Sequence, residues 1–401
     1  MAITIAIAKE TAHEERRVAA TPETVKKLVA LGARVKIESG AGNASAIFDD
    51  AYGAAGAEIA ATRAELFKDA DIVLKVRIGE EDINDSPSGA LLVGLFAPYQ
   101  NAELIAKAAN KRLGGFSMEL VPRITRAQAM DVLSSQSNLA GYKAVLDAAE
   151  HFGRAFPMMM TAAGTIAPAR VFVMGAGVAG LQAIATAKRL GAVVSATDVR
   201  PASKEQVESL GGTFIAVQDE EFKAAETAGG YAKEMSDDYK AKQAALIEET
   251  IAKQDIVITT ALIPGRPAPK LVTAKMVESM KPGSVIVDLA VESGGNCELS
   301  EPGAVVAKNG VTIVGHLNVP GRLATDASAL YARNIFNLLA LVIDKENAAL
   351  AIDWDDDIIK GIALTRDGAI IHPSFAPEKP AEKAKEETVE EATEKTTPAQ
   401  G

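Results

Sequence analysis

The sequence contains few of the residues on which several classes of protein depend. A single cysteine, Cys297, excludes a disulfide framework within the chain and favours a reducing compartment. The four histidines, His13, His151, His316 and His372, do not have the spacing of a metal site. No apolar run approaches the ~20 residues that a membrane-spanning helix needs, so we expect no direct insertion into a membrane.

Charge and composition narrow the class further. The formal net charge is −11 and no basic stretch stands out, which disfavours nucleic acid as a partner. Apolar residues make up 48% of the chain and charged residues 24%, the balance of an ordinary globular protein. A chain of 401 residues is too long for one ordinary core, so we expect two domains. Residues 1–8 alternate like a strand and lack the features of a signal peptide, so a cytoplasmic location is expected.

The most informative segment that the chain does contain runs from Val171 to Gly180, with the sequence VFVMGAGVAG. An apolar run leads into glycines, a helical pattern follows over 178–190, and a second apolar run over 193–197 ends at Asp198. Strand, glycine turn, helix, strand and acid in this order are typical of a dinucleotide-binding unit.

Each residue of this unit has a physical role. Gly175 permits the tight turn, Gly177 lets a pyrophosphate approach the backbone, and Gly180 lets the helix and strand pack closely. The helix N-terminus attracts phosphate through its unpaired N–H groups and its dipole. Asp198 accepts hydrogen bonds from ribose hydroxyls and repels a 2′-phosphate, which favours NAD over NADP. The alternative is a tight glycine turn that binds nothing.

The remaining pattern alternates strands with helices and predicts an α/β protein of two Rossmann-like, doubly wound parallel-sheet domains separated by a cleft. Long helices are expected over 137–152, bridging the domains, and over 325–344, crossing back to the first domain. Further strands are expected over 3–8, 35–38, 72–76, 91–95, 256–260, 284–288 and 311–314.

We therefore expect residues 1–136 plus 325–375 to form the first domain and 137–324 the dinucleotide-binding domain. Residues 219–242 are charged, contain a glycine pair and have no clean period, which is typical of a lid or a disordered loop. Residues 376–401 contain too few apolar side chains for a core and are expected to be a disordered acidic tail, either a tether or an end without a role.

A dense polar cluster precedes the bridging helix and contains Arg123, Gln128 and Asp131. Arginine can bind a carboxylate, phosphate or amide oxygen, and glutamine can pair with a carboxamide through both a donor and an acceptor. Asp131 can orient the arginine or cap the helix. Spacing alone equally allows a cluster that only caps helices at a domain junction.

Other polar or apolar candidates have two interpretations each. Cys297 is a nucleophile or, more simply, a small half-buried residue, and His316 is catalytic or structural. Lys75 faces a cleft or extends to water. Met158–Met160 form core or interface surface.

Four long segments carry a family resemblance. They are RITRAQAMDVLSSQSNLAGY ending at Tyr142, MMMTAAGT ending at Thr165, AETAGGYAKEM ending at Met235, and DLAVESGGNC ending at Cys297. Through them the sequence resembles, over residues 1–375, the NAD(H)-binding α1 subunits of bacterial proton-translocating transhydrogenases, within the wider alanine dehydrogenase/transhydrogenase family.

The resemblance implies a role for individual residues. The loop with Arg123, Gln128 and Asp131 would hold the nicotinamide end as the catalytic loop, with Ser134 on the carboxamide. The nucleotide contacts that it implies are Ala176, Gly177 and Val178 at the pyrophosphate, Asp198, Val199 and Arg200 at the adenosine ribose, Gly230 and Tyr231 on a closing loop near Met235, and Gln243, Ala261 and Leu262.

The resemblance also implies partners and an activity. Hydride would pass directly from NADH on this chain to NADP⁺ on a β subunit, in a Re/Si-specific reaction that a membrane-spanning subunit couples to proton translocation. The chain would form a homodimer, with Met158–Ala167 as the candidate contact, and would be peripheral on the cytoplasmic face of the bacterial inner membrane through its partners.

Two other functions remain open from the sequence. An alanine dehydrogenase-like enzyme needs proton transfer, for which that family supplies a lysine and a histidine. Lys75 occupies the lysine-like place, but Phe96 stands at the histidine-like place, which argues against amino-acid oxidation. A non-enzymatic NAD-sensing module is the third possibility.

Overall fold

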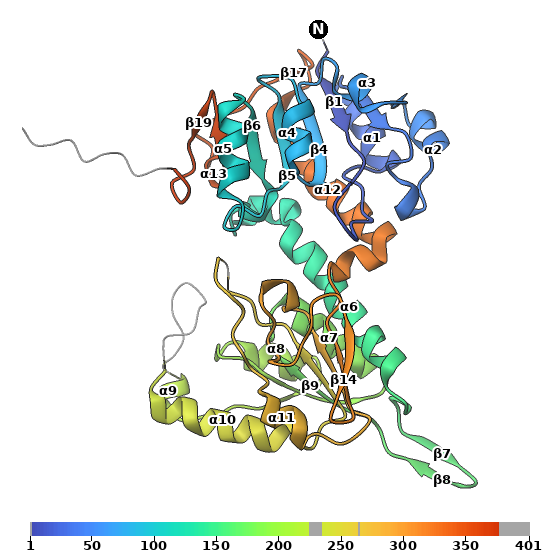
Figure 1. Ribbon diagram of the computed structural model, residues 1–401, viewed down its shortest axis with the longest axis vertical. Coiled ribbons are helices and arrows are strands. Elements are labelled where there is room, and N and C mark those ends of the chain that lie inside the picture. The colour runs from blue at the N-terminus through green and yellow to red at the C-terminus, as the bar shows by residue number, and fades with distance from the viewer. Residues whose placement is uncertain (1, 224–234, 264, 377–401) are drawn as a thin grey trace, which may run out of the picture.

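The computed structural model describes residues 2–223, 235–263 and 265–376. It contains two α/β units, one above the other along the long axis, with helices α6 (Val132–His151) and α12 (Ala324–Val342) running between them (Figure 1). This confirms the predicted α/β class with two sheets of parallel strands. Among the described residues, no helix has the length and apolar character to cross a membrane.

The first unit is built on an eight-stranded sheet in the order β19-β18-β6-β5-β4-β1-β2-β3. Strands β1 to β6 are parallel, whereas β18 runs antiparallel to β6 and β19 antiparallel to β18. The wholly parallel expectation is therefore wrong at this edge. The strands are β1 (Thr4–Ile7), β2 (Arg34–Glu38), β3 (Glu58–Ala60), β4 (Ile72–Arg77), β5 (Leu91–Leu95), β6 (Gly114–Ser117), β18 (Ala363–Arg366) and β19 (Ala369–Ile370).

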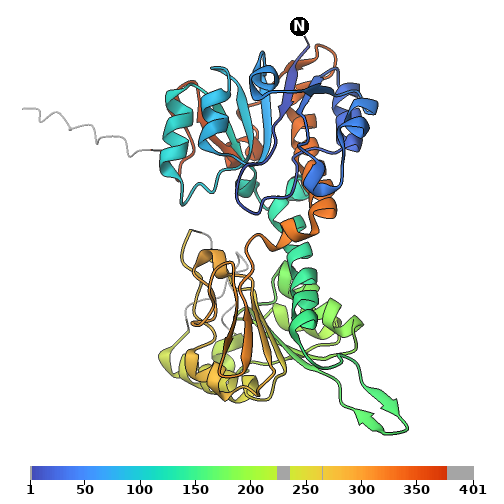
Figure 2. The ribbon, with the colours of Figure 1, turned by 45° about the vertical axis from the view of Figure 1, so that its right-hand side comes forward.

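Short helices connect these strands and cover the sheet. They are α1 (Pro22–Ala30), α2 (Asp49–Ala54), α3 (Arg63–Phe67), α4 (Glu80–Asp85), α5 (Ala102–Asn110) and α13 (Asp357–Ile362), with the 3-10 turn η3 (Thr125–Met130) leading into α6. Since β18 and β19 follow α12, the chain leaves this unit, builds the second and returns, as Figure 2 also shows.

The second unit has a seven-stranded sheet in the order β11-β10-β9-β12-β13-β15-β14, parallel except for β14. The order reverses between β9 and β12, which makes this the switch point where ligands bind in such sheets. The strands are β9 (Arg170–Met174), β10 (Val193–Thr197), β11 (Thr213–Phe214), β12 (Ile256–Thr259), β13 (Val285–Asp288), β14 (Val305–Lys308) and β15 (Val311–Val314). The helices are α7 (Val178–Arg189), α8 (Ser203–Ser209), α9 (Glu220–Lys223), α10 (Asp237–Ile251) and α11 (Ala274–Ser279).

Helix α6 is longer than its sequence pattern predicts. It begins at Val132 rather than at 137, because the Asp131 side chain caps it by accepting a hydrogen bond from the Ser134 N–H at 2.9 Å. Further along, a Cβ on Gly141 would lie only 2.0 Å from the carbonyl oxygen of Ala179. Glycine at 141 thus lets α6 pack directly against the first turn of α7.

A two-stranded hairpin, β7 (Met159–Thr161) and β8 (Gly164–Ile166), extends away from the second unit (Figure 1). Met160 is 79% exposed, and Met158, Met159 and Ile166 are exposed as well. The alternative that Met158–Met160 belong to the core is therefore wrong. A second small hairpin, β16 (Ile343–Asp344) and β17 (Ala349–Leu350), follows α12.

The junction between the units is organised around the buried Glu15 carboxylate. It accepts hydrogen bonds from Arg17 Nη2 at 2.7 Å, from Arg77 Nε at 3.1 Å and from Asn318 Nδ2 at 3.1 Å. Arg17 Nη1 in turn donates to Gln136 on α6 at 2.9 Å. The loop before α1, the end of β4, the segment after β15 and the bridging helix therefore meet at one side chain.

Two further contacts cross the junction. Glu292 of the second unit accepts a hydrogen bond from the Asn318 N–H at 3.1 Å and lies 3.5 Å from Arg77 Nη2 of the first. On the loop after β12, a Cβ on Gly265 would lie 2.9 Å from the Tyr99 ring of the first unit. The relative position of the two units is thus set by specific polar and steric contacts as well as by the two helices.

Glu15→Gln tests the junction. Burial alone would raise the pKa of Glu15, but hydrogen bonds and the charge of Arg17 outweigh it and lower the pKa to about 2. A carboxyl whose folded pKa is lowered stabilises the fold above its ordinary pKa of 4.5, and this contribution is lost as the pH falls toward 2. Urea unfolding should show a loss of about 3 kcal/mol in Glu15→Gln at pH 7, because Arg17 loses its buried partner.

The same titrations should show a flatter pH dependence of stability below pH 4.5 for Glu15→Gln than for the unaltered chain. Glu58→Gln is the matched control, since Glu58 pairs with Arg34 on the exposed surface, where such pairs contribute about 0–1 kcal/mol. Equal losses in the two variants would contradict the assigned role of Glu15.

Candidate functional site

Three segments end side by side at the carboxyl edge of the second sheet. Met174 of β9 is paired in register with Thr197 of β10 and with Thr259 of β12. The next residues, Gly175, Asp198 and Thr260, therefore leave the sheet at the same level. The predicted glycine turn and the predicted acid are adjacent because neighbouring parallel strands place them so.

The glycines of the turn meet different requirements. Gly175 has φ +105° and packs so closely that a Cβ would lie 2.6 Å from Thr260 Oγ1. A Cβ on Gly180 would lie 1.8 Å from the Gly175 carbonyl oxygen, so α7 can approach β9 only with glycine there. A Cβ on Gly177 would meet nothing within 4 Å among the described atoms. Open space thus lies at the N-terminus of α7, where a phosphate is best stabilised.

Asp198 is held ionised beside this turn. Its carboxylate is 7% exposed and accepts hydrogen bonds from the Ala176 N–H at 2.7 Å and from Arg200. Burial alone would raise its pKa, but the hydrogen bonds from Arg200 and from the Ala176 N–H hold the pKa below its ordinary value. A charged acceptor therefore lies within hydrogen-bond reach of the turn.

Exposed apolar side chains surround the turn and the acid. Val178 at the start of α7, Val199 after Asp198 and Leu262 after β12 are all exposed. Gln243 of α10 reaches the end of β10, where its Nε2 lies 3.3 Å from Thr197 Oγ1. Apolar edges beside a charged acceptor and a helix N-terminus fit a nucleotide, which has a flat ring, a sugar and phosphates.

A residue that the sequence did not single out positions Ala261. The buried Asn296 side chain accepts a hydrogen bond from the Ala261 N–H at 3.0 Å and donates to the carbonyl oxygens of Ala261 at 2.9 Å and Pro269 at 2.8 Å. Asp288, at the end of β13, accepts hydrogen bonds from the Cys297 N–H and from Ser300. Residue type draws attention to the cysteine of this SGGNC segment, whereas its asparagine holds the loop after β12.

The polar loop predicted as catalytic lies on η3 and the first turn of α6. Arg126 pairs with Asp356 at 2.7 Å, and the Ala129 carbonyl oxygen accepts hydrogen bonds from Asn334 at 2.8 Å and Asn337 at 2.9 Å on α12. These contacts fix the loop and leave Arg123 and Gln128 exposed. Asp131 and Ser134 instead bond to each other, with Ser134 Oγ 2.6 Å from Asp131 Oδ2.

Helix α6 relates this loop to the glycine turn. Asp131 caps its N-terminus, and Gly141 touches Ala179 of α7 ten residues later, which is about 15 Å along a helix. The loop and the N-terminus of α7 are thus at two fixed places on one rigid element.

Several sequence expectations are corrected. Lys75 neither faces a cleft nor extends to water: it is 1% exposed, donates to the Lys9 carbonyl oxygen at 2.9 Å and lies 3.4 Å from Asp82 and 3.8 Å from Glu10. Cys297 is fully buried, and burial raises the pKa of its thiol, which disfavours a nucleophile. Burial lowers the pKa of His316, whose neighbours include Arg322 and Asp147.

The expected lid segment is partly helical. Residues 219–242 include α9 and the start of α10, and Met235 packs against the core of the second unit. The predicted contacts Gly230 and Tyr231 lie outside the described residues.

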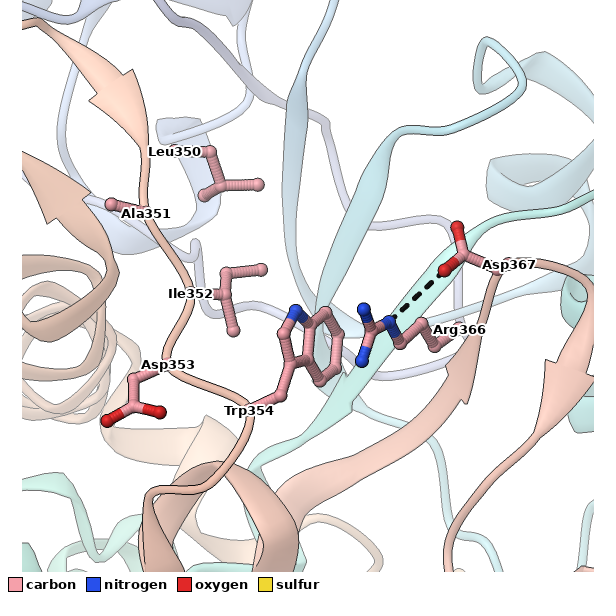
Figure 3. Close-up of a pocket in the computed structure, with 7 residues that line it drawn as sticks. All are labelled: Leu350, Ala351, Ile352, Asp353, Trp354, Arg366 and Asp367. Carbon is pink, nitrogen blue, oxygen red and sulfur yellow. Dashed lines mark hydrogen bonds and ion pairs between the residues drawn. The ribbon is translucent and has the colours of Figure 1, made fainter.

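An open hollow in the first unit contains none of the predicted site residues (Figure 3). The Arg366 guanidinium lies 4.2 Å from the centroid of the Trp354 ring and pairs with Asp367 at 3.1 Å. Its lining comprises Leu350, Ala351, Ile352, Asp353, Trp354, Arg366 and Asp367.

Comparison with known proteins decides the family. Residues 6–140 match the model of the alanine dehydrogenase/PNT N-terminal domain, and residues 144–373 match that of the alanine dehydrogenase/PNT C-terminal domain. The chain belongs to this family. Membership agrees with NAD(H) binding and with the resemblance seen in the sequence.

The similar proteins point to one branch of the family. An NAD(P) transhydrogenase subunit alpha from Rhodospirillum rubrum is 57% identical over 92% of this chain and 98% of its own length. A crystal structure of transhydrogenase from Sinorhizobium meliloti is 56% identical and superposes with a TM-score of 0.84, covering 92% of this chain and 100% of that one. A structure of L-alanine dehydrogenase has 26% identity and a TM-score of 0.78, covering 93% of this chain and 98% of its own.

Asn296→Ala tests the newly identified positioning of Ala261. Three backbone groups would lose their partner, so the loop after β12 should move and NADH should bind about tenfold or more weakly, as expected for the loss of about 1–3 kcal/mol. Titration of the intrinsic NADH fluorescence measures the affinity.

Ser300→Ala serves as the control, because Ser300 bonds to Asp288 but not to the loop. NADH should bind this variant as it binds the unaltered chain. Equal affinities in all three proteins would show that the loop does not depend on Asn296.

Proposed function

We propose that this chain is the NAD(H)-binding component of a proton-translocating transhydrogenase, which passes hydride from NADH to NADP⁺ held on a partner subunit. The 57% identity to a transhydrogenase α subunit over nearly its full length is the observation that carries the proposal. The glycine turn, Asp198 and the exposed polar loop support it, because they supply binding and orientation.

Each component of the site has a task in this function. The N-terminus of α7 would hold the pyrophosphate at Gly177, and Asp198 would accept the ribose hydroxyls. Arg123 and Gln128 would orient the nicotinamide carboxamide, because they are exposed on a loop that Arg126, Asn334 and Asn337 anchor. The bound nucleotide supplies the hydride, and the chain supplies its position.

Hydride transfer between two nicotinamide rings leaves the protonation of both rings unchanged. It requires close approach, correct orientation and exclusion of water, but no general acid or base. A site whose exposed groups bind and orient a nucleotide is suited to this task.

Amino-acid oxidation, as in the alanine dehydrogenases of the same family, is less well supported. That reaction needs proton transfer by side chains at the substrate. Lys75 is buried between Glu10 and Asp82, and Phe96, at the histidine-like place, is buried and carries no proton that could be transferred. The chain therefore keeps the fold of these enzymes without this lysine and histidine pair in place.

The proposal includes partners. A β subunit would bind NADP(H), and a membrane-spanning subunit would move protons and keep this chain peripheral on the cytoplasmic face. The domain division at 1–136 plus 325–375, 137–324 and 376–401 belongs to the same proposal.

The activity can be tested with the purified chain and an NADP(H)-binding transhydrogenase subunit. Mixing NADH on the first with NADP⁺ on the second should give rapid hydride exchange, followed by deuterium transfer from labelled NADH. Neither component alone should catalyse it.

NAD⁺ with L-alanine is the opposing test. Strong NADH formation by the chain alone would overturn the proposal in favour of an alanine dehydrogenase. NADH binding without exchange in the reconstituted system would instead support a sensing module.

A homodimer is also proposed, with the β7–β8 hairpin as its contact. Met158, Met159, Met160 and Ile166 expose apolar surface on a hairpin that extends from the unit (Figure 2), and such surface is typical of an interface.

Met160→Glu should shift the chain from dimer toward monomer in sedimentation equilibrium, because a buried unpaired charge opposes association. Leu341→Glu introduces the same charge at an exposed apolar position on α12 and should leave the dimer intact. A dimer that survives Met160→Glu would place the contact elsewhere.

A further inference from the structure

The ribose acceptor proposed above is already occupied by the chain itself. Asp198 Oδ1 accepts hydrogen bonds from the Arg200 N–H at 2.9 Å and from Arg200 Nε at 2.9 Å. Oδ2 accepts from the Ala176 N–H at 2.7 Å and from Arg200 Nη2 at 2.9 Å. A carboxylate offers about four lone-pair positions, so a ribose cannot be added without removing a donor.

The donors differ in how easily they can leave. The N–H groups of Ala176 and Arg200 belong to the backbone of the glycine turn and of the segment after β10, so their positions follow from the fold. The guanidinium is on a flexible side chain that is 36% exposed. It also presents two donors in a fork, one to each carboxylate oxygen, as the two neighbouring hydroxyls of a ribose would.

We propose that the Arg200 guanidinium is a displaceable occupant of the ribose position and that it sets the nucleotide specificity of this site. NADH must replace the fork with its two hydroxyls. A 2′-phosphate cannot do so, because at neutral pH it mainly accepts hydrogen bonds and is repelled by the carboxylate.

The ion pair has a second consequence for specificity. Arg200 is the group that would attract a 2′-phosphate, but the fork to Asp198 engages it. Asp198 therefore excludes NADP(H) twice, once by repulsion and once by holding Arg200. This inference rests on the proposed function, in which the exchange of hydride between two nucleotides requires that each occupy a separate site.

The test is a set of NADH and NADPH fluorescence titrations of the full chain and its Asp198→Ala, Arg200→Ala and double variants. Arg200→Ala should bind NADH more tightly, by about threefold to tenfold, because one charge-assisted competitor is gone. Asp198→Ala should bind NADH about tenfold more weakly and should gain affinity for NADPH, since the guanidinium becomes available to the phosphate. The double variant should lose that gain.

Lys204→Ala is the matched control, because it removes a nearby cation that donates to Gln218 rather than to the carboxylate. Both affinities should be unchanged in it. Unchanged or weaker NADH binding in Arg200→Ala, or equal NADPH binding in Asp198→Ala and the double variant, would overturn the role of Arg200. Absence of NADH binding by the unaltered chain would overturn the proposed function itself.

Discussion

The buried ion pair between Glu15 and Arg17 is the interaction on which the arrangement of the two units depends. Glu15 joins the first unit to the segment that carries Asn318, and Arg17 extends the network to Gln136 at the start of α6. A buried charge left without its partner is costly, so the network favours one arrangement over many. The first turn of α6, which carries some of the polar loop, is thereby tied to the junction.

The glycine turn depends on a second constraint, the register of parallel strands. Pairing of β9 with β10 and β12 brings Gly175, Asp198 and Thr260 to one edge, and Asn296 and Gly180 then set how the neighbouring loop and helix approach. Helix α6 connects the two constraints, because its start lies in the junction network and Gly141 lies against α7. A rigid element thus relates the orienting loop to the phosphate end of the site.

The sequence predicts what is local and misses what depends on distant packing. The strand, turn and acid around Gly175 follow from residue type and spacing, and so does the α/β class. Lys75 could not be placed, because its burial depends on Glu10 and Asp82 from other segments. Strand β18 could not be placed either, since its antiparallel partner β6 is far away in the sequence. Local pattern also does not distinguish exposed methionines on a hairpin from a core strand, as Met158–Met160 illustrate.

The electrostatics of the first unit explain why the chain shares a fold with dehydrogenases without requiring their chemistry. Burial raises the pKa of Glu10 to about 7, against the opposing charge of Lys75. Lys75 also donates to the Lys9 carbonyl oxygen and lies near Asp82, so its ammonium is already engaged within the fold. An ammonium held this way stabilises the loop before α1 but is unavailable to a substrate carboxylate or imine. With Phe96 buried in a core of the same unit, the unit retains the scaffold of an acid–base site and leaves orientation of a nucleotide as the task for which its exposed groups are suited.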